Sequence, residues 1–362
     1  MNIPNLTYHP PMPRRKDFRI GILGSGFIVD DCHLVAYRNA GFNPVAIASR
    51  DTATATRVAA RHGVPRVHDS YAALLDDPAI EVLDIAVPPQ AQPDLVRAAC
   101  ARGTVKGILA QKPLAIGHAE AAGLVACCEQ AGIVLAVNQN MRYDPSVYLA
   151  KALLDHGTLG DPVFATIDMR GIPHWKPWAD QFDSPTPWIM SIHHLDCMRY
   201  WFGDPERVYC SSRPDPRTTF PHRDGICTTI LEYANGLRAV IIDDVWTGPA
   251  HEGCPGDIRI HWRIEGLDGL AMGDLGWCKD PYTTPSTLRF ACKGDTGFHD
   301  IFPKESWFPD AFGATMGELL HALENNRPPG IGGRDNLRTI ALVDAAVRGA
   351  AEHRSVPITP IS

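Results

Sequence analysis

The sequence predicts an α/β fold class: an N-terminal domain built on a parallel sheet, followed by an α+β domain with an open antiparallel sheet. Three observations predict it. Strand-like and helix-like segments alternate up to about residue 140, a glycine-rich turn follows the first strand, and hairpin signals dominate afterwards. Alternation of strands with helices of about ten to fifteen residues is typical of right-handed βαβ units on a parallel sheet.

The elements of the first part are apolar runs and Ala-rich segments that end at breakers. Ser70 is placed to cap a short helix, Gly103 stops another, and a proline pair ends the strand at Val87. The expected strands are Arg19–Leu23, Pro44–Ala48, Val82–Val87, Val105–Ala110 and Ile133–Val137, and the expected helices are Thr52–His62, Ser70–Leu75, Gln92–Arg102 and Gly117–Gln130.

The second part changes in texture after about Asn140. Asn235-Gly236 lies between two alternating runs and favours the positive backbone angles of a type I′ hairpin turn. A second Gly-rich turn separates a further pair of strands. The expected elements are helix Asp144–His156, strands Ile226–Tyr233, Leu237–Asp243, Arg259–Glu265 and Leu270–Met272, and helices Asp310–Glu324 and Asp335–Glu352.

Composition excludes several classes of function. The chain has 362 residues, 45% apolar and 21% charged, with a formal net charge of −7 and no basic block. These values predict two globular domains and argue against nucleic acid and anionic membranes as partners. No run approaches the ~20 apolar residues of a membrane span.

The ten cysteines are scattered between Cys32 and Cys292 without a C-x-x-C pair. In a chain of this size, the pattern predicts reduced thiols in the cytoplasm and no structural metal. Residues 1–16 carry four prolines and no apolar core of signal-peptide length, so they are expected to form a disordered or strapping arm.

Gly24-Ser25-Gly26 follows a strand and opens a helix, as in the dinucleotide-binding turn of a Rossmann fold. The first glycine allows the tight turn, and the second lets the backbone approach a pyrophosphate at a helix N-terminus. The second strand ends at Ser49-Arg50, where a hydroxyl and a guanidinium favour the 2′-phosphate of NADP. Asp51 is placed to reach a ribose, and Arg50 can also stack on adenine or lie in solvent, so NAD stays open.

Lys112-Pro113 follows the expected strand Val105–Ala110. The carboxyl ends of parallel strands border the ligand crevice of a doubly wound sheet. Lys112 is therefore a candidate proton shuttle beside a nicotinamide, although a lysine at a strand end is more often a solvated charge.

Four segments together resemble the Gfo/Idh/MocA family (glucose-fructose oxidoreductase, inositol dehydrogenase and rhizopine catabolism protein). Ala110–Ala115 resembles its E-K-P-x-A signature, and Val137–Tyr143 resembles the segment after its sixth strand. Gly157–Gly160 resembles its G-x-I-G, and Ile192–Asp196 followed by Gly203 resembles its H-x-x-D helix. The resemblance spans nearly the whole chain.

The resemblance implies that Lys112 lies beside the nicotinamide and the reacting hydroxyl, and that the Lys112-Pro113 bond is cis. It implies that His193 is the general acid or base, whereas His194 points about 100° away on a helix. The implied cofactor-binding residues are Gly24, Gly26, Phe27, Ile28, Ser49, Arg50, Pro88, Gln111, Lys112 and Asn140, and the implied substrate-binding residues are Arg142, Arg170, Trp175, His194 and Asp196.

Two positions depart from the family pattern. Ile189 stands where an aspartate is common, four residues before His193, and Asp180 and Asp183 are candidates to replace that carboxylate. Gln111 stands where a glutamate precedes the lysine. A neighbouring carboxylate raises the pKa of a lysine, so its replacement by an amide predicts that Lys112 loses its proton easily when NAD(P)⁺ is bound.

Two polar clusters lie in the second part, and the second of them contains Arg213, Asp215, Arg217, His222, Arg223 and Asp224. Arg170, His174, Trp175, Lys176 and Trp178 combine aromatic faces with hydroxyl-binding groups, which suits a sugar or an aromatic packing cluster between subunits. Asp243 and Asp244 are adjacent on a strand and are expected to point to opposite faces.

The sequence therefore predicts an arm at 1–16, an NAD(P)-binding Rossmann domain at 17–140, and a substrate-binding and oligomerisation domain at 141–362. The expected function is hydride transfer between NAD(P) and a hydroxyl-bearing carbon of a sugar, glycoside or cyclitol, in a cytoplasmic homodimer or homotetramer. Two alternatives stay open: an imine or dihydrodiol reductase on the same fold, and a dinucleotide-binding regulatory protein without catalysis.

Overall fold

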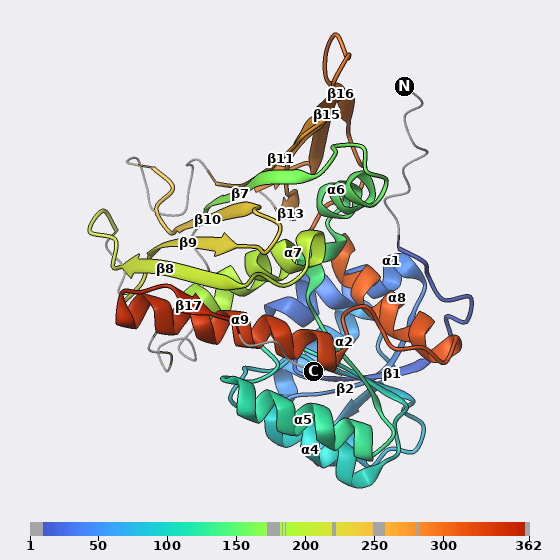
Figure 1. Cartoon of the computed structure of the whole chain (residues 1–362). Coiled ribbons are helices and arrows are strands. Elements are labelled where there is room, and N and C mark those ends of the chain that lie inside the picture. Colours follow the sequence, from blue (N-terminus) through green and yellow to red (C-terminus); the bar gives the residue numbers. More distant parts are fainter. Residues whose placement is uncertain are drawn as a thin grey trace. The chain divides into compact units, whose positions relative to one another are not determined.

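The structure is a computed structural model that describes residues 10–171, 182, 184, 186–218, 222–248, 258–279 and 282–358. Contacts divide the described chain into two compact units. The first unit contains residues 10–143 and 308–337, and the second contains residues 144–307 and 338–358. Each unit is built around its own sheet (Figure 1).

The first unit holds a parallel sheet of six described strands in the order β3-β2-β1-β4-β5-β6. The order reverses between β1 and β4, which is where a doubly wound sheet forms its ligand crevice. The strands are β1 Arg19–Leu23, β2 Asn43–Ala48, β3 Arg66–His68, β4 Val82–Ile85, β5 Gly107–Ala110 and β6 Val134–Val137. This confirms the predicted Rossmann fold.

Helices cover both faces of this sheet. Helices α4 and α5 pack against each other on one face, and α1 packs against α8 on the other (Figure 1). The helices of this unit are η1 Ile28–His33, α1 Leu34–Ala40, α2 Thr52–His62, α3 Tyr71–Leu75, α4 Gln92–Arg102, α5 His118–Gln130, η2 Asn140–Tyr143 and α8 Asp310–Glu324.

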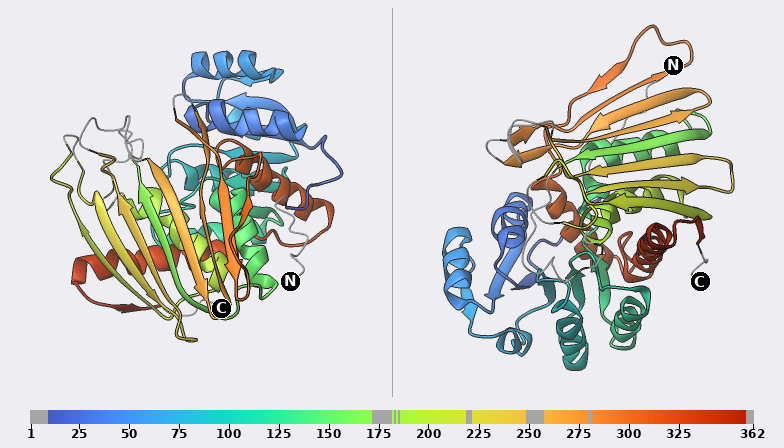
Figure 2. Two further views of the ribbon diagram at one scale, coloured as in Figure 1. Left: turned by 90° about the horizontal axis from the view of Figure 1, so that it is seen from above. Right: turned by 90° about the vertical axis from the view of Figure 1, so that its left-hand side faces the viewer.

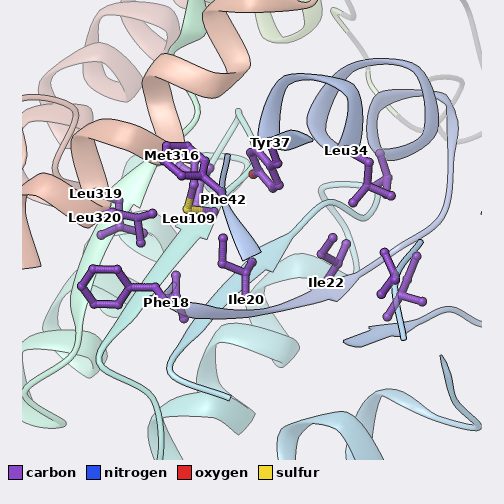
Figure 3. Close-up of a cluster of buried hydrophobic side chains, with 14 of the residues drawn as sticks. Phe18, Ile20, Ile22, Leu34, Tyr37, Phe42, Leu109, Met316, Leu319 and Leu320 are labelled. Carbon is purple, nitrogen blue, oxygen red and sulfur yellow. The ribbon is translucent and has the colours of Figure 1, made fainter. Parts of the chain in front are cut away.

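The packing of α8 differs from the predicted domain bounds, which placed it with the second domain. Met316, Leu319 and Leu320 of α8 are buried in one cluster with Ile20 and Tyr37 (Figure 3). The apolar face of α8 is thus buried by the first sheet and by α1, which explains why this late helix belongs to the first unit.

Residues 10–16, the described part of the predicted arm, run along α8. The backbone N–H groups of Arg14 and Arg15 donate to the carboxylate of Glu324 at 3.0 and 2.9 Å. A Cβ at Gly317 would lie 2.6 Å from Sδ of Met12, so the arm packs directly on the helix. Residues 10–16 therefore form a strapping arm, which was one of the two predicted possibilities, and they pack on α8.

The second unit holds a sheet of nine described strands in the order β16-β15-β12-β11-β7-β10-β9-β8-β17. All neighbouring pairs are antiparallel except β7 and β10, so the expected antiparallel sheet is mixed at one position. Its strands are β7 Pro162–Arg170, β8 Arg207–Arg213, β9 Ile226–Glu232, β10 Arg238–Asp244, β11 Arg259–Gly266, β12 Gly269–Asp274, β15 Thr287–Cys292, β16 His299–Ile301 and β17 Val356–Pro357.

One face of this sheet is covered by helices, as Figure 2 shows. Trp262 of β11 is fully buried there, donates its indole N–H to Oγ of Ser146 at 3.0 Å, and packs on Trp201. The remaining elements are α6 Pro145–Asp155, η4 Pro187–Ser191, α7 Ile192–Phe202 and α9 Gly333–Glu352, with a short hairpin of β13 Trp277–Lys279 and β14 Tyr282–Thr284.

The hairpin of β9 and β10 forms where it was predicted, but its turn is not type I′. Gly236 has φ of 91°, whereas Asn235 is absent from the described non-glycine residues with positive φ. The N–H of Gly236 donates to the carbonyl of Tyr233 at 3.0 Å. A single glycine with positive φ fits a longer turn that ends in a bulge.

No helix in the described part of the chain is both long and apolar enough to cross a membrane.

Candidate active site

The carboxyl ends of five parallel strands are aligned in the first unit. The last residues Ala48, Leu23, Ile85, Ala110 and Val137 pair in register across the sheet. The segments that follow these strands carry all of the predicted cofactor-binding residues. The fold therefore brings the glycine turn, the Arg50 loop, Lys112 and the segment after β6 to one edge of the sheet.

The glycine turn has the geometry that a pyrophosphate needs. Gly24 has φ of 117°, and a Cβ there would lie 2.2 Å from the carbonyl oxygen of Ala86. Only glycine fits at this position. A Cβ at Gly26 would meet no atom within 4 Å, and Gly26 is exposed. Open space on this side of Gly26 lets a bound phosphate approach the backbone, so the residues present fit a dinucleotide.

The helix after this turn begins as a π-helix, Ile28–His33, and continues as α1. Phe27 and Ile28 are half-buried at its start, where no side chain caps the first amide groups. The N-terminal end of a helix carries a partial positive charge, which favours an anionic ligand. The π-helical turn was not predicted, and π-helical turns frequently mark functional sites.

The three polar residues in the loop after β2, Ser49, Arg50 and Asp51, differ in their contacts. Asp51 caps α2: its Oδ1 accepts the N–H of Thr54 at 3.2 Å, and its Oδ2 accepts the Thr54 hydroxyl. Ser49 is half-buried and Arg50 is exposed. Arg50 makes no ion pair with a described residue, so its guanidinium is available to a ligand.

Lys112 follows β5, and the Lys112-Pro113 peptide bond is cis, as the resemblance implies. Lys112 is half-buried. This burial lowers the pKa of Lys112 to about 7. Pro88 is half-buried after β4, and Asn140 is buried at the start of η2.

A buried hydrogen-bonded cluster beside Lys112 was missed in the sequence. Nδ1 of His33 lies 2.6 Å from Oδ2 of Asp84, which also accepts the hydroxyl of Tyr37 at 2.8 Å. Nε2 of His33 lies 3.0 Å from the amide nitrogens of both Gln111 and Asn138. Because Nδ1 faces a carboxylate it carries the proton, which leaves Nε2 as the acceptor for the two amides. We name these five residues the His33 cluster.

One signal for this cluster is visible in the sequence. Asp84 interrupts an otherwise apolar strand, and a buried carboxylate in such a strand requires partners. The partner His33 is 51 residues away, so no local pattern identifies it.

In the second unit, α7 presents its two adjacent histidines to different neighbours. The His193 ring is buried and packs edge-on against Trp307, with ring centroids 5.4 Å apart. Nδ1 of His194 lies 2.7 Å from Oδ1 of Asp243 on β10. Asp243 also accepts the hydroxyl of Ser191, so Asp243 contacts both the end of η4 and the start of α7.

The segment before His193 is the π-helix Pro187–Ser191, which contains buried Ile189. The sequence pattern did not predict this π-helical turn, which directly precedes α7. Asp180 and Asp183, the candidates to replace the family's aspartate, lie outside the described residues.

Two predicted substrate-binding residues have structural partners. Asp196 is buried and accepts the hydroxyl of Thr339 at 2.7 Å, and Arg199 donates to the same hydroxyl at 2.6 Å. Arg142 lies 2.7 Å from the carboxylate of Asp335. The contacts of Asp196 and Arg199 with Thr339 hold α7 on α9, and the contact of Arg142 with Asp335 holds the segment after β6 on the start of α9. The sequence pattern does not reveal these structural contacts.

Arg170 ends β7 in a network of ion pairs. It lies 3.0 Å from Asp168 and 2.5 Å from Asp244, which Arg217 also contacts at 2.8 Å. Asp243 and Asp244 therefore point to opposite faces of β10, as predicted. The remaining members of the predicted sugar-binding cluster, His174, Trp175, Lys176 and Trp178, lie outside the described residues.

Within the described residues, no group of three or more His, Cys, Asp or Glu side chains is arranged to hold a metal ion.

Comparison with known proteins gives two consistent family matches. Residues 18–139 match the NAD-binding Rossmann fold of the Gfo/Idh/MocA oxidoreductase family, and residues 151–358 match the C-terminal alpha/beta domain of that family. The second match alone spans more than half of the chain.

Individual relatives agree with the family match. The chain is 26% identical to D-apiose dehydrogenase of Paraburkholderia graminis, over 95% of this chain and 90% of that protein. It is 31% identical to trans-1,2-dihydrobenzene-1,2-diol dehydrogenase of Sus scrofa, over 83% of this chain and 84% of that protein. A structure of levoglucosan dehydrogenase with NADH and levoglucosan matches with a TM-score of 0.81 and 20% identity, over 95% of this chain and all of that one.

The glycine turn, the Lys112 segment, the α7 histidines and both family matches lead to one conclusion: the chain is an NAD(P)-dependent oxidoreductase of the Gfo/Idh/MocA family.

Proposed function

We propose that this enzyme transfers a hydride between NAD(P) and a hydroxyl-bearing carbon of a sugar, glycoside or cyclitol, with Lys112 and His193 as its proton-transfer groups. The observation that carries the proposal is the position of Lys112 just after β5, at the sheet edge where the glycine turn follows β1. Burial also lowers the pKa of Lys112 to about 7. A general acid or base works best when its pKa lies near the working pH.

The proton balance of the reaction defines what Lys112 does. Bound NAD(P)⁺ supplies the hydride acceptor, and oxidation of the alcohol also releases one proton from the reacting hydroxyl. Neutral Lys112 Nζ accepts that proton as the C=O bond forms, and the ammonium returns it in the reverse direction. A lysine of ordinary pKa would be protonated at pH 7 and would serve only the reverse reaction.

His193 is proposed as the second proton-transfer group. It is buried near the start of α7, and Trp307 fixes its ring from the edge. A histidine held by packing keeps one orientation, which a proton relay or a hydroxyl contact requires. His194 lies against Asp243 instead, so we assign the proton-transfer role to His193.

For the cofactor we propose NADP over NAD. Arg50 is exposed and makes no ion pair with a described residue, and Asp51 is committed to the cap of α2. A carboxylate that holds both ribose hydroxyls favours NAD, whereas an arginine at this strand end accommodates a 2′-phosphate. Fluorescence titration with NADPH and NADH tests the preference, and tighter binding of NADH would contradict it.

The substrate class is proposed from the relatives. D-apiose dehydrogenase shares 26% identity over nearly the whole chain, which favours a carbohydrate hydroxyl. The test is cofactor reduction, followed at 340 nm, with D-apiose, D-xylose, myo-inositol and a methyl glucoside, each with NAD⁺ and NADP⁺. Lys112→Met should abolish turnover of the best substrate without loss of cofactor binding. Near-normal turnover by Lys112→Met would refute the assignment of Lys112.

A second candidate is oxidation of a dihydrodiol. It is favoured by the 31% identity to trans-1,2-dihydrobenzene-1,2-diol dehydrogenase. The same assay with trans-1,2-dihydrobenzene-1,2-diol separates the two candidates, since a carbohydrate enzyme should prefer its sugar by kcat/KM. Cofactor binding without turnover of any of these compounds would instead favour the regulatory alternative.

We also propose that the open face of the large sheet forms a homodimer or homotetramer interface. Val163, Phe164 and Tyr209 on β7 and β8 expose 49%, 36% and 37% of their surfaces. On the hairpin, Ile230 pairs with Val240 and Thr228 with Ile242, and these side chains are half-buried. An apolar sheet face of this extent gains stability from a partner surface. Sedimentation of a monomer at micromolar concentration would contradict this assignment.

A further inference from the structure

Gln92, the first residue of α4, makes an unusual set of contacts with the segment that carries Lys112. Its side chain is fully buried although glutamine is normally exposed. We propose that Gln92 is a positioning residue for Lys112, an inference that rests on the proposed catalytic role of Lys112.

The Gln92 amide contacts the main chain on both sides of Lys112. Its Nε2 donates to the carbonyl oxygens of Gln111, Pro113 and Leu114 at 2.8, 3.1 and 3.0 Å. Its Oε1 accepts the N–H of Gln111 at 2.7 Å. One side chain thus joins α4 to three of the four residues 111–114, and the residue that it skips is Lys112.

The local sequence cannot hold this segment by itself. The regular pairing of β5 ends at Ala110, and Pro113 has no N–H to donate. Three carbonyl oxygens that converge on one point repel one another unless a donor lies between them. Buried carbonyl groups without a donor are destabilising, so the amide of Gln92 selects the backbone conformation seen here.

The side chain of Gln111 is held from elsewhere. Its amide nitrogen lies 3.0 Å from Nε2 of His33, so its contact with His33 is separate from its main-chain contact with Gln92. Gln92 therefore fixes the backbone, and the His33 cluster fixes a neighbouring side chain. Loss of Gln92 should move the Cα of Lys112 without removing any group that touches the substrate or the cofactor.

Such a displacement affects both the position and the protonation of Lys112. A shift of about 1 Å at a reacting group costs on the order of a hundredfold in rate. The pKa of Lys112 is lowered by burial, so a looser segment that admits water should return it toward the ordinary value. A purely structural glutamine would change stability and leave both properties intact.

The test uses Gln92→Met, which keeps the length of the side chain and removes its hydrogen bonds. Gln130→Met, an exposed position at the end of α5, is the matched control. The titration of Lys112 is read by trace labelling with acetic anhydride between pH 6 and 10 and peptide mass spectrometry, with Lys151 and Lys293 as internal references. Turnover of the best substrate is measured with the same proteins.

In Gln92→Met we expect the apparent pKa of Lys112 to rise by about one unit or more. We expect kcat to fall about tenfold or more while KM changes little. Gln92→His, which keeps one donor and one acceptor, should recover part of both losses, and it also serves if Gln92→Met does not fold. Wild-type titration and kcat in a folded Gln92→Met would overturn the inference.

The experiments distinguish failure of the catalytic role of Lys112 from failure of the positioning role of Gln92. Full activity of Lys112→Met would refute the catalytic role of Lys112, whereas the labelling of Gln92→Met would still report whether the segment is held. An inactive Lys112→Met together with a normal Gln92→Met would leave the catalytic role standing and refute the positioning role of Gln92.

Discussion

Asp84→Ala tests the His33 cluster through the stability of the first unit. Asp84 is fully buried in β4, and its Oδ2 lies 2.6 Å from Nδ1 of His33 and 2.8 Å from the hydroxyl of Tyr37. Burial and the nearby carboxylate raise the pKa of Tyr37 well above its usual range, so its hydroxyl stays a donor. The substitution removes the acceptor and leaves two buried donors without a partner.

The cost follows from those two donors. Each buried donor that loses its partner costs about 1–3 kcal/mol, so the two donors together cost about 2–6 kcal/mol. We therefore expect Asp84→Ala to lower the free energy of unfolding by about 4 kcal/mol. At about 2–4 °C per kcal/mol for a unit of this size, the Tm falls by roughly 8–16 °C.

The assay is urea unfolding together with calorimetry, with Asp94→Ala as the control. The side chain of Asp94 is 90% exposed on α4, so its removal should change stability by less than about 0.5 kcal/mol. Tyr37→Phe added to Asp84→Ala should cost less than it does alone, because the two residues share one bond. A loss below about 1 kcal/mol in Asp84→Ala, or full additivity with Tyr37→Phe, would refute the assigned contacts.

Three further predictions concern the site. For alcohol oxidation, log(kcat/KM) should rise with pH up to about 7 and then level off, because Lys112 must lose its proton. For the reverse reaction, log(kcat/KM) should decline above the same pH. An oxidation profile without the rise below a pH of about 7 would contradict the role of Lys112. Gly24→Ala should abolish NADPH binding in a fluorescence titration, since its Cβ would lie 2.2 Å from a backbone oxygen, and tight binding would show that the turn relaxes. Arg50→Ala should weaken NADPH binding about tenfold and leave NADH binding unchanged. An equal loss for both cofactors would assign Arg50 to the adenine, and no loss for either would show that Arg50 makes no contact.

Local patterns in the sequence predicted most of the elements but not their long-range packing. The apolar run Arg19–Leu23 and helix Asp310–Glu324 have the predicted bounds, because strand and helix periods and their breakers are local. The same period does not say which sheet α8 covers, and its burial by Ile20 and Tyr37 joins segments almost 300 residues apart. Asn235-Gly236 predicted the hairpin and not its turn type, because a glycine with positive φ fits both.

The predicted site residues that follow a strand directly lie at the expected edge of the sheet. Lys112 and Gly24 follow strands directly, so the fold alone brings them to one edge. Gln92 and His33 escaped prediction for a different reason. Each acts on residues that are distant in sequence, and neither residue type is unusual at the start or end of a helix. Asp84 was the detectable member, as an acid within a buried strand.

The tautomer of His33 explains why an amide, and not a carboxylate, fits at position 111. Nδ1–H of His33 faces the Asp84 carboxylate, so Nε2 can accept an N–H from Gln111 but would repel a carboxylate. A glutamate at 111 would therefore add a second negative charge to the buried cluster or require His33 to take up a proton. Gln111 keeps the cluster at one carboxylate, beside a lysine whose pKa is about 7.

Gln111→Glu consequently tests whether the low pKa of Lys112 depends on this amide. A carboxylate on the neighbouring residue favours the ammonium form of Lys112 and therefore raises its pKa. The acidic limb of the oxidation profile should move to higher pH by about one unit or more. Gln130→Glu, with the same change at an exposed site, should leave the limb in place. An unchanged limb in folded Gln111→Glu would mean that His33 takes up the added charge, and that burial alone sets the pKa of Lys112.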